Sequence, residues 1–338
     1  MIIVLKPRTT EENILRVENM VRARGLETHT VRGEELTIIG CIGDTVRVDP
    51  RLFEVDKSVE KVMHVQEPYK LANRAFHPED TIVKTAHTEV GGNKLALMAG
   101  PCSVESEEHI HRMAKVAKEA GATVLRGGAF KPRTSPYSFQ GLGEEGLKYL
   151  REAADENGMD VITEVMDDEH VELVGKYTDF FQIGARNMQN FSLLKEVGKT
   201  KIPVALKRGM SATIDDVLNA AEYIAAGGNN QIILIERGIR TFDNKYTRNT
   251  FDVGAVPVLQ QLTHYPVIVD PSHAAGVWNL VTPLAQAGVA AGASGLIVEI
   301  HDDPEHAFSD GPQALKPDTF KEMARRCEVI HKVVSAWK

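Results

Sequence analysis

The first part of the chain, residues 1–65, combines short apolar runs with one amphipathic segment. Short apolar runs bounded by polar residues predict strands, and apolar positions three or four residues apart predict helices. In order, the predicted elements are the strand Ile2–Leu5, the helix Thr10–Arg24, the strands Thr28–Val31 and Leu36–Cys41, the helical segment Pro50–Val55 and the strand Val59–Val65. The order strand–helix–strand–strand–helix–strand is that of a ferredoxin-like domain, which we predict for residues 1–65.

Residues 66–93 interrupt this pattern and predict a connector. Within it, Thr81–Lys84 and His87–Val90 alternate between apolar and polar residues as the two strands of a hairpin would. We expect this hairpin to close the bottom of the domain that follows.

From residue 94 to residue 338, short apolar runs alternate with helical patterns. The predicted strands are Lys94–Ala99, Thr123–Leu125, Asp160–Glu164, Phe180–Ile183, Pro203–Leu206, Gln231–Ile235, Pro266–Val269 and Gly295–Val298. The predicted helices are Glu107–Glu119, Glu145–Asn157, Asp168–Val174, Phe191–Val197, Ile214–Ala226, Val253–Leu262, Trp278–Ala290 and Asp318–Ser335. Eight strands that each precede a helix predict a (β/α)8 TIM barrel. An open doubly wound sheet is the alternative, but no Gly-x-Gly-x-x-Gly motif follows the first strand of this region.

Composition and charge narrow the class of protein. The 338 residues are 43% hydrophobic and 25% charged, with a formal net charge of −8 and no basic block, which argues against a nucleic-acid partner. The three cysteines do not predict a disulfide framework. The first residues do not resemble a signal peptide, and no window approaches the roughly 20 apolar residues of a membrane span. We therefore expect a soluble cytoplasmic enzyme.

The carboxyl ends of barrel strands converge on one face, where barrel enzymes carry their active sites. Cationic side chains follow several of the predicted strands: Arg126, Lys131, Arg133, Arg186, Lys207 and Arg237. Cations that converge in one pocket are destabilising unless an anion neutralises them. Their number predicts a site for more than one phosphate, or for a phosphate and a carboxylate. The alternative is that they diverge into solvent as rim residues.

A second set of strand-end residues has the chemistry of a metal site. Cys102, His273, Glu299 and Asp310 offer a thiolate, an imidazole and two carboxylates, which suit Mn²⁺, Fe²⁺, Co²⁺ or Zn²⁺. The first and eighth strands of a closed barrel are neighbours, so these residues are predicted to meet in space. Cys102 as a small buried apolar residue and His273 as a hydrogen-bonded loop residue are the alternatives. Asp270 either orients His273, assists proton transfer or caps the following turn.

Five motifs at these strand ends resemble those of 3-deoxy-D-arabino-heptulosonate 7-phosphate (DAHP) synthase. They are Ala99–Ser103, Leu125–Ser135, Ile183–Asn187, Lys207–Gly209 and Asp270–His273. The resemblance covers about residues 80–338. It implies a condensation of phosphoenolpyruvate with erythrose 4-phosphate that releases inorganic phosphate, the first step of the shikimate pathway.

The resemblance also implies roles for individual residues. The metal ligands would be Cys102, His273, Glu299 and Asp310. The phosphoenolpyruvate site would comprise Arg126, Lys131, Arg186, Lys207 and Arg237, with Gly184, Ala185 and Glu164 nearby. The erythrose 4-phosphate site would comprise Lys131, Pro132, Arg133, Thr134 and Ser135. Lys131 is the candidate acid for the new hydroxyl, and Glu164 or Asp270 would manage the attacking water.

Two other functions remain open at this point. The related 3-deoxy-D-manno-octulosonate 8-phosphate synthase uses arabinose 5-phosphate, but it carries an Asn-Arg-Ser type sequence where this chain has Lys131–Ser135. Cys102 favours a metal-dependent enzyme, because metal-free members of that related family have Asn there. A metabolite-sensing barrel without catalysis would need a broken metal set or cationic cage, and neither is broken in this sequence.

The N-terminal region resembles the ACT-like regulatory domain of one branch of DAHP synthases. In that branch aromatic amino acids bind between regulatory domains of a homotetramer. The resemblance implies Tyr or Phe as feedback inhibitors, and a domain that only supports oligomerisation is the alternative.

Overall fold

The computed structural model describes residues 1–33, 36–43, 45, 48–63, 67–133 and 135–337. The chain forms two compact units, Met1–Asp80 with Gln261–His264, and Thr81–Gln260 with Tyr265–Lys338. Among the described residues, no helix has the length and apolar character needed to cross a membrane.

The N-terminal unit has the predicted ferredoxin-like order. Its elements are β1 (Ile2–Leu5), α1 (Glu11–Arg22), β2 (Glu27–Arg32), β3 (Thr37–Ile42), α2 (Arg51–Glu54) and β4 (Val59–Met63). The four strands form one sheet in the order β2-β3-β1-β4 with antiparallel neighbours. The last two residues of the predicted strand Val59–Val65 lie outside the described residues.

Alternation along β1 gives this sheet two apolar faces. Ile3 and Leu5 pack on one side with Val17 and Val21 of α1, because successive side chains of a strand point to opposite faces. On the other side, Ile2 and Val4 belong to a separate buried cluster that includes Phe76. The sheet is therefore covered on both faces within its own unit.

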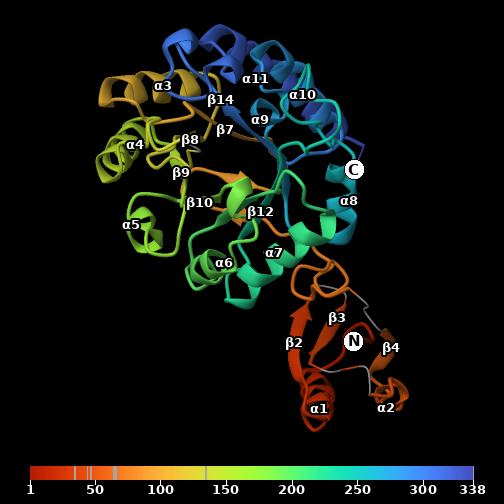
Figure 1. Cartoon of the computed structure of the whole chain (residues 1–338). Coiled ribbons are helices and arrows are strands. Elements are labelled where there is room, and N and C mark those ends of the chain that lie inside the picture. Colours follow the sequence, from red (N-terminus) through yellow and green to blue (C-terminus); the bar gives the residue numbers. More distant parts are fainter. Residues whose placement is uncertain (34–35, 44, 46–47, 64–66, 134, 338) are drawn as a thin grey trace. The chain divides into compact units, whose positions relative to one another are not determined.

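The larger unit is a closed parallel barrel, so the TIM-barrel prediction is confirmed and the open-sheet alternative is wrong. Its strands are β7 (Ala96–Gly100), β8 (Val124–Arg126), β9 (Asp160–Glu164), β10 (Phe180–Ile183), β11 (Val204–Lys207), β12 (Ile232–Glu236), β13 (Val267–Val269) and β14 (Gly295–Glu299). The sheet closes because β14 pairs in parallel with β7, from Gly295 with Ala96 to Glu299 with Gly100. Figure 1 shows the strands at the centre of this unit, surrounded by helices.

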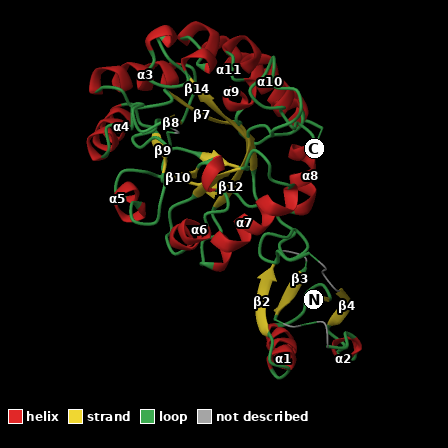
Figure 2. Cartoon of the chain, viewed as in Figure 1, coloured by secondary structure: helices red, strands yellow, loops and turns green. Residues whose placement is uncertain are grey.

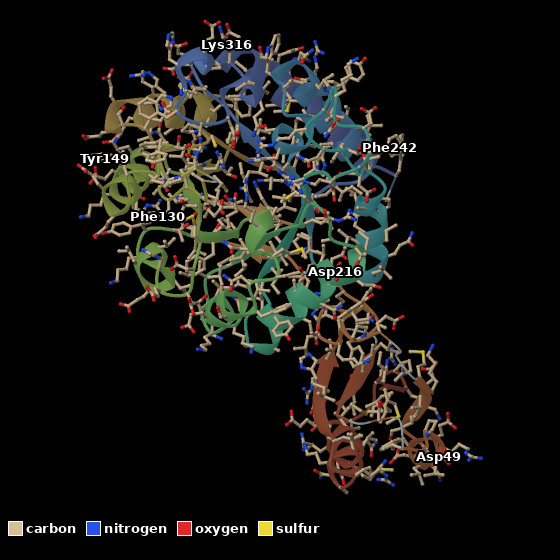
Figure 3. The ribbon with its side chains drawn as sticks, in the orientation of Figure 1. Asp49, Phe130, Tyr149, Asp216, Phe242 and Lys316 are labelled. Carbon is tan, nitrogen blue, oxygen red and sulfur yellow. The ribbon has the colours of Figure 1, made fainter. Side chains whose placement is uncertain are left out.

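The helices lie where the hydrophobic periodicity places them. Their bounds are α3 (Glu107–Glu119), α4 (Glu144–Glu156), α5 (Val171–Gly175), α6 (Phe191–Gly198), α7 (Ile214–Ala226), α8 (Ala255–Leu262), α10 (Trp278–Ala290) and α11 (Pro317–Ser335). Figure 2 shows them as an outer layer around the strands, and Figure 3 places Tyr149 of α4 and Lys316, next to α11, at the edge of this unit. Local signals fix several starts: Ser106 caps α3 by accepting a hydrogen bond from the His109 backbone, and Thr213 and Asp216 form a capping box at α7.

Four short helices were not predicted. They are α9 (Pro271–Ala275) and the 3₁₀ turns η1 (Ala185–Asn187), η2 (Pro304–His306) and η3 (Gly311–Gln313). The predicted helix Asp168–Val174 is also shorter than expected, since α5 begins only at Val171. These segments are too short to show a helical period in the sequence.

The hairpin of β5 (Val83–Lys84) and β6 (Glu89–Val90) packs at the end where the barrel strands begin. Val83 and Val90 are fully buried in the same cluster as inward-facing residues of all eight strands. The hydroxyl of Thr85 donates a hydrogen bond of 2.6 Å to Asp160, the first residue of β9. Because the hairpin fills this end, the opposite end of the barrel carries the open site.

Candidate active site

A cavity of about 440 Å³ lies at the carboxyl ends of the barrel strands. Its lining comes from the ends of five of the strands and the loops after them, those of β8, β10, β11, β12 and β14, and from Glu164 of β9 and His273 of α9. The lining residues are Lys131, Pro132, Arg133, Ser135, Ser138, Glu164, Gly184, Ala185, Arg186, Lys207, Met210, Arg237, Arg240, Arg248, Asn249, His273 and Asp310. The size is typical of a small-molecule site, for which about 300–1,000 Å³ is usual.

Positive charge dominates this cavity. Among the described residues, seven lysines and arginines line it against two carboxylates, Glu164 and Asp310. Arg237 is only 5% exposed, and its Nε and Nη1 atoms have no hydrogen-bond partner. Burial lowers the pKa of Arg237 because it penalises the charged form. A buried cation with free donors is costly unless an anion binds beside it, so this cavity is suited to anionic ligands.

The structure brings most of the predicted substrate residues to the cavity. Those that line it are Lys131, Pro132, Arg133, Ser135, Glu164, Gly184, Ala185, Arg186, Lys207 and Arg237. Thr134 lies outside the described residues. Arg126 does not line the cavity: its Nη1 atom donates a hydrogen bond to the Pro101 carbonyl and lies 3.1 Å from Glu299.

The predicted metal-ligating residues also meet at this end of the barrel. Ligand atoms of Cys102, Glu299 and Asp310 lie within 4.8 Å of one another, and the Cys102 sulfur lies 3.4 Å from Oδ2 of Asp310. His273 joins the group through its Nε2 atom, which lies 3.5 Å from Oε1 of Glu299. The closure of the barrel between β7 and β14 produces this meeting, as the sequence predicted.

The electrostatics of the set favour ionised carboxylates, and burial works against the charged form of the imidazole. Burial opposes ionisation of Glu299, but His273 and Arg126 outweigh it and lower its pKa. The pKa of Asp310 falls to about 2, because His273 and Arg248 together exceed the opposing effect of burial. Burial lowers the pKa of His273 despite the adjacent Asp270, which leaves a lone pair for a metal ion.

The pKa of the Cys102 thiol is raised, in contrast to those of the carboxylates, when only protein groups surround it. Burial, assisted by Glu299, raises its pKa to about 11. A divalent cation reverses this tendency, because a coordinating thiol is deprotonated. Oε1 of Glu299 is buried and accepts no hydrogen bond. A thiol, an imidazole and two carboxylates with one unsatisfied buried oxygen fit a divalent transition ion.

Asp270 fixes the orientation of His273. Its Oδ1 atom accepts the backbone N–H of His273 at the start of α9. Its Oδ2 atom lies 2.8 Å from Nδ1 of His273 and 2.6 Å from Nζ of Lys207. Burial opposes ionisation, but His273 and Lys207 hold the pKa of Asp270 well below its ordinary value. The carboxylate therefore caps the helix and also holds the imidazole with Nε2 directed to Glu299.

Lys131 connects the cavity with the cysteine. Its Nζ atom donates hydrogen bonds to the Cys102 carbonyl at 2.9 Å and to the Cys102 sulfur at 3.1 Å. Glu164 also lines the cavity, and its Oε2 atom accepts a hydrogen bond from Gln182. Gly184 allows this arrangement, since a Cβ atom at that position would lie 2.2 Å from Glu164.

Two family comparisons match the two units. Residues 1–67 match the DAHP synthase ferredoxin-like domain, and residues 80–335 match the DAHP synthetase I family. The chain belongs to the DAHP synthetase I family. It is an enzyme of the 3-deoxy-7-phosphoheptulonate synthase class. Enzymes of this class are transferases that form a carbon–carbon bond.

Relatives of this DAHP synthase family member match between 69% and 99% of the chain. Phospho-2-dehydro-3-deoxyheptonate aldolase of Thermotoga maritima is 51% identical over 330 residues, which cover 98% of this chain and 97% of the relative. The crystal structure of phospho-2-dehydro-3-deoxyheptonate aldolase (DAHP synthase) from T. maritima matches with a TM-score of 0.79 at 49% identity, covering 99% of this chain and 98% of that one. The 2-dehydro-3-deoxyphosphooctonate aldolase of Koribacter versatilis is 35% identical over 253 residues, which cover 69% of this chain and 89% of the relative.

Sequence reasoning missed several residues of the DAHP synthase site. Arg240, Arg248 and Asn249 line the cavity from the long loop after β12, and Gln313 of η3 contacts Glu299. Each of them lies in its loop beyond the first polar residues that follow β12 or β14. The one available signal was the density of basic residues in the loop, where Lys245 accompanies the two arginines.

A second group with metal-ligating side chains lies outside the cavity lining. Glu105, His109 and His301 bring potential ligand atoms within 4.8 Å of one another. However, Nδ1 of His301 accepts the backbone N–H of Asp303, so its Nε2 atom carries the proton and points to Glu105 at 3.4 Å. Glu105 also accepts the backbone N–H of Phe308. We therefore interpret this group as a hydrogen-bonded anchor for the loop that precedes Asp310.

Proposed function

We propose that this protein joins C3 of phosphoenolpyruvate to the aldehyde carbon of erythrose 4-phosphate. Water adds at C2 of the phosphoenolpyruvate unit, the C–O bond to phosphate breaks, and DAHP and inorganic phosphate are released. The product is the starting compound of the shikimate pathway, which leads to aromatic amino acids.

The observation that carries this proposal is the cationic cavity beside the metal-ligating set. Two phosphorylated substrates bring enough negative charge to neutralise the arginines and lysines of the lining, including the unpartnered Arg237. Binding both in one cavity converts an encounter between them into an effectively unimolecular reaction. Arg186, Lys207 and Arg237 would hold phosphoenolpyruvate, and Arg133 and Ser135 would hold the phosphate of the aldose.

Cys102, His273, Glu299 and Asp310 would hold one divalent ion, which is Mn²⁺, Fe²⁺, Co²⁺ or Zn²⁺ in this proposal. When bound, such an ion supplies Lewis acidity that polarises a carbonyl oxygen. Asp270 serves this site by holding His273 with Nε2 available, at the 2.8 Å contact with Nδ1.

Lys131 is the proposed proton donor to the new hydroxyl. Its ammonium group contacts Cys102 and also lines the cavity, so it lies at the border of the metal-ligating set and the substrate space. Glu164 lines the cavity beside Gly184 and is the proposed group that orients the attacking water. Asp270 is the less direct choice for that task, because Lys207 and His273 already occupy it.

The proposed sugar substrate follows from the loop after β8. Lys131, Pro132, Arg133 and Ser135 all line the cavity, as a binding site for a small aldose phosphate requires. The alternative acceptor is arabinose 5-phosphate, because the aldolase of K. versatilis named above covers most of the barrel. The match of residues 1–67 to a DAHP synthase domain supports the four-carbon acceptor.

For the N-terminal unit we propose feedback regulation by Tyr or Phe within a homotetramer. Residues 1–67 match the DAHP synthase ferredoxin-like domain, and the described part of this unit contributes no residue to the cavity lining. A unit whose described residues contribute nothing to the cavity lining is suited to a regulatory rather than a catalytic task.

The metal part of the proposal is tested with Cys102→Ala. The variant should lose metal binding and most turnover, because the site loses its only sulfur ligand, while its circular dichroism stays unchanged. Cys327→Ala is the matched control, since Cys327 is also buried but lies on α11. Undiminished, metal-stimulated turnover in Cys102→Ala would show that the metal assignment is wrong.

A further inference from the structure

Each carboxylate of the metal-ligating set has one oxygen that accepts a hydrogen bond from a residue outside the set. Oε2 of Glu299 accepts a 2.7 Å hydrogen bond from Nε2 of Gln313, while its Oε1 atom lies 3.1 Å from Nη1 of Arg126 and 3.5 Å from Nε2 of His273 without a hydrogen bond. Oδ1 of Asp310 accepts a 3.1 Å hydrogen bond from Arg248, while Oδ2 faces the Cys102 sulfur at 3.4 Å. In both residues the outer contact leaves the other oxygen directed to the set.

Gln313 joins these two contacts into one chain. Its Oε1 atom accepts a 3.0 Å hydrogen bond from Nη1 of Arg248, and its Nε2 atom donates to Glu299. Gln313 is 2% exposed and Glu299 is also 2% exposed, so water does not compete for the bond between them, whereas the Arg248 side chain is 40% exposed. A buried amide that uses its oxygen and its nitrogen on different partners has one orientation only.

The backbone holds Arg248 in place at the other end of the chain. The backbone N–H of Arg248 donates a 2.9 Å hydrogen bond to the Ala275 carbonyl at the end of α9. Gly276, the residue after Ala275, has a φ of +71°, and a Cβ atom there would lie 2.4 Å from the Cβ atom of Arg248. Only glycine permits this close approach. Because α9 also carries His273, the same short helix positions a proposed ligand and the outer arginine.

We propose that Gln313 and Arg248 are positioning residues that hold the carboxylates of Glu299 and Asp310 ready for the divalent ion. This inference rests on the proposed metal site and deepens it. Without these contacts each carboxylate gains rotamers that turn its oxygens away from the ion, and the ion must select the correct orientation. Loss of such outer contacts typically lowers metal affinity by about 10- to 100-fold.

Gln313 offers the cleaner test of the two. Replacing Arg248 removes a positive charge near the ion, so its electrostatic effect on cation binding opposes its positioning effect. Gln313 is neutral, and Gln313→Met keeps the length and the charge while removing both hydrogen bonds. A change in affinity then reports the positions of the carboxylates.

The experiment measures the dissociation constant of Co²⁺ for the metal-stripped full chain by competition with a chelating dye, without substrates. For Gln313→Met we expect a dissociation constant about 10- to 100-fold above that of the unmodified chain. The thiolate-to-Co²⁺ absorption band should weaken or move, which a loss of packing alone would not cause. Gln231→Met is the control, because Gln231 donates a similar 3.0 Å hydrogen bond, to the Lys201 carbonyl, at the opposite end of the barrel.

Three outcomes decide the matter. A folded Gln313→Met variant whose dissociation constant and absorption band stay within twofold of the unmodified chain would overturn the positioning role alone. An unmodified chain that does not bind Co²⁺ would overturn the metal site itself, and the positioning role with it. Where Gln313→Met does not fold, Gln313→Asn is measured by the same criterion, since its shorter amide cannot reach both partners.

Discussion

Arg133 and Ser135 contribute a guanidinium group and a hydroxyl to the cavity from the loop after β8. These groups are proposed to bind the phosphate of the aldose, at a distance along the chain from the residues proposed for phosphoenolpyruvate. A bidentate contact between arginine and phosphate fixes orientation as well as charge.

Replacing Arg133 should therefore separate the two substrates in steady-state kinetics. For Arg133→Ala we expect the KM for erythrose 4-phosphate to rise roughly 10- to 100-fold, the range for a lost hydrogen bond to a charged group. The KM for phosphoenolpyruvate should change far less. Arg325→Ala is the control, because Arg325 pairs with Glu322 on the exposed face of α11. Equal increases in both constants would remove Arg133 from the sugar site.

Single site residues could be predicted where they end a strand or belong to the motif that follows it. Cys102, Lys131, Lys207 and His273 meet that condition, and the structure brings them to one end of the barrel. Gln313 could not be predicted in this way, because it acts through Glu299 and lies in a loop without periodicity. Arg126 shows the converse, since a strand-end position did not place it in the cavity lining.

At the level of secondary-structure elements, the hairpin of β5 and β6 covers one end of the barrel core and keeps solvent out of it. Val90 is fully buried there, among inward-facing residues such as Ile162 and Ile297. Close packing makes such a residue sensitive to loss of volume, because the space that it leaves is only partly refilled.

Val90→Ala should destabilise the protein by about 1–3 kcal/mol, the range expected for two buried methyl groups plus the cavity that they leave. Urea unfolding, followed by circular dichroism, measures the change. Ile82→Ala serves as the control, because Ile82 lies next to β5 but is 45% exposed. If the two variants lose the same stability, the hairpin does not contribute to the barrel core.

The elements themselves could largely be predicted, because each barrel strand is a short apolar run and each long helix has an apolar stripe. Predicted and observed bounds of α3, α7 and α10 coincide. α9 could not be predicted, since its five residues contain less than two helical turns. Its start depends instead on Asp270, whose carboxylate both caps the helix and contacts His273.

At the scale of the whole molecule, closure of the barrel brings β7 beside β14 and so joins Cys102 to Glu299 and Asp310. The number of strand–helix units in the sequence allowed this closure to be predicted. The sequence pattern did not identify the contacts that hold the carboxylates, because they depend on side-chain geometry in loops.

The two units should also be separable in function. Deletion of residues 1–64 is expected to leave the condensation reaction intact, because no described residue of that segment lines the cavity. Inhibition by Tyr or Phe should disappear in the shortened protein. Initial rates with and without each amino acid measure both effects, with the full chain as the reference. Inhibition that persists after the deletion would contradict a regulatory role for the N-terminal unit.

The measurement that tests the account most directly is release of inorganic phosphate from phosphoenolpyruvate with one aldose phosphate at a time. The metal-loaded full chain is assayed with erythrose 4-phosphate, with arabinose 5-phosphate and with no acceptor. The proposed reaction predicts rapid phosphate release with erythrose 4-phosphate, accompanied by a seven-carbon keto acid phosphate, and little release in the other two assays. Faster release with arabinose 5-phosphate, or release that needs no acceptor, would contradict it.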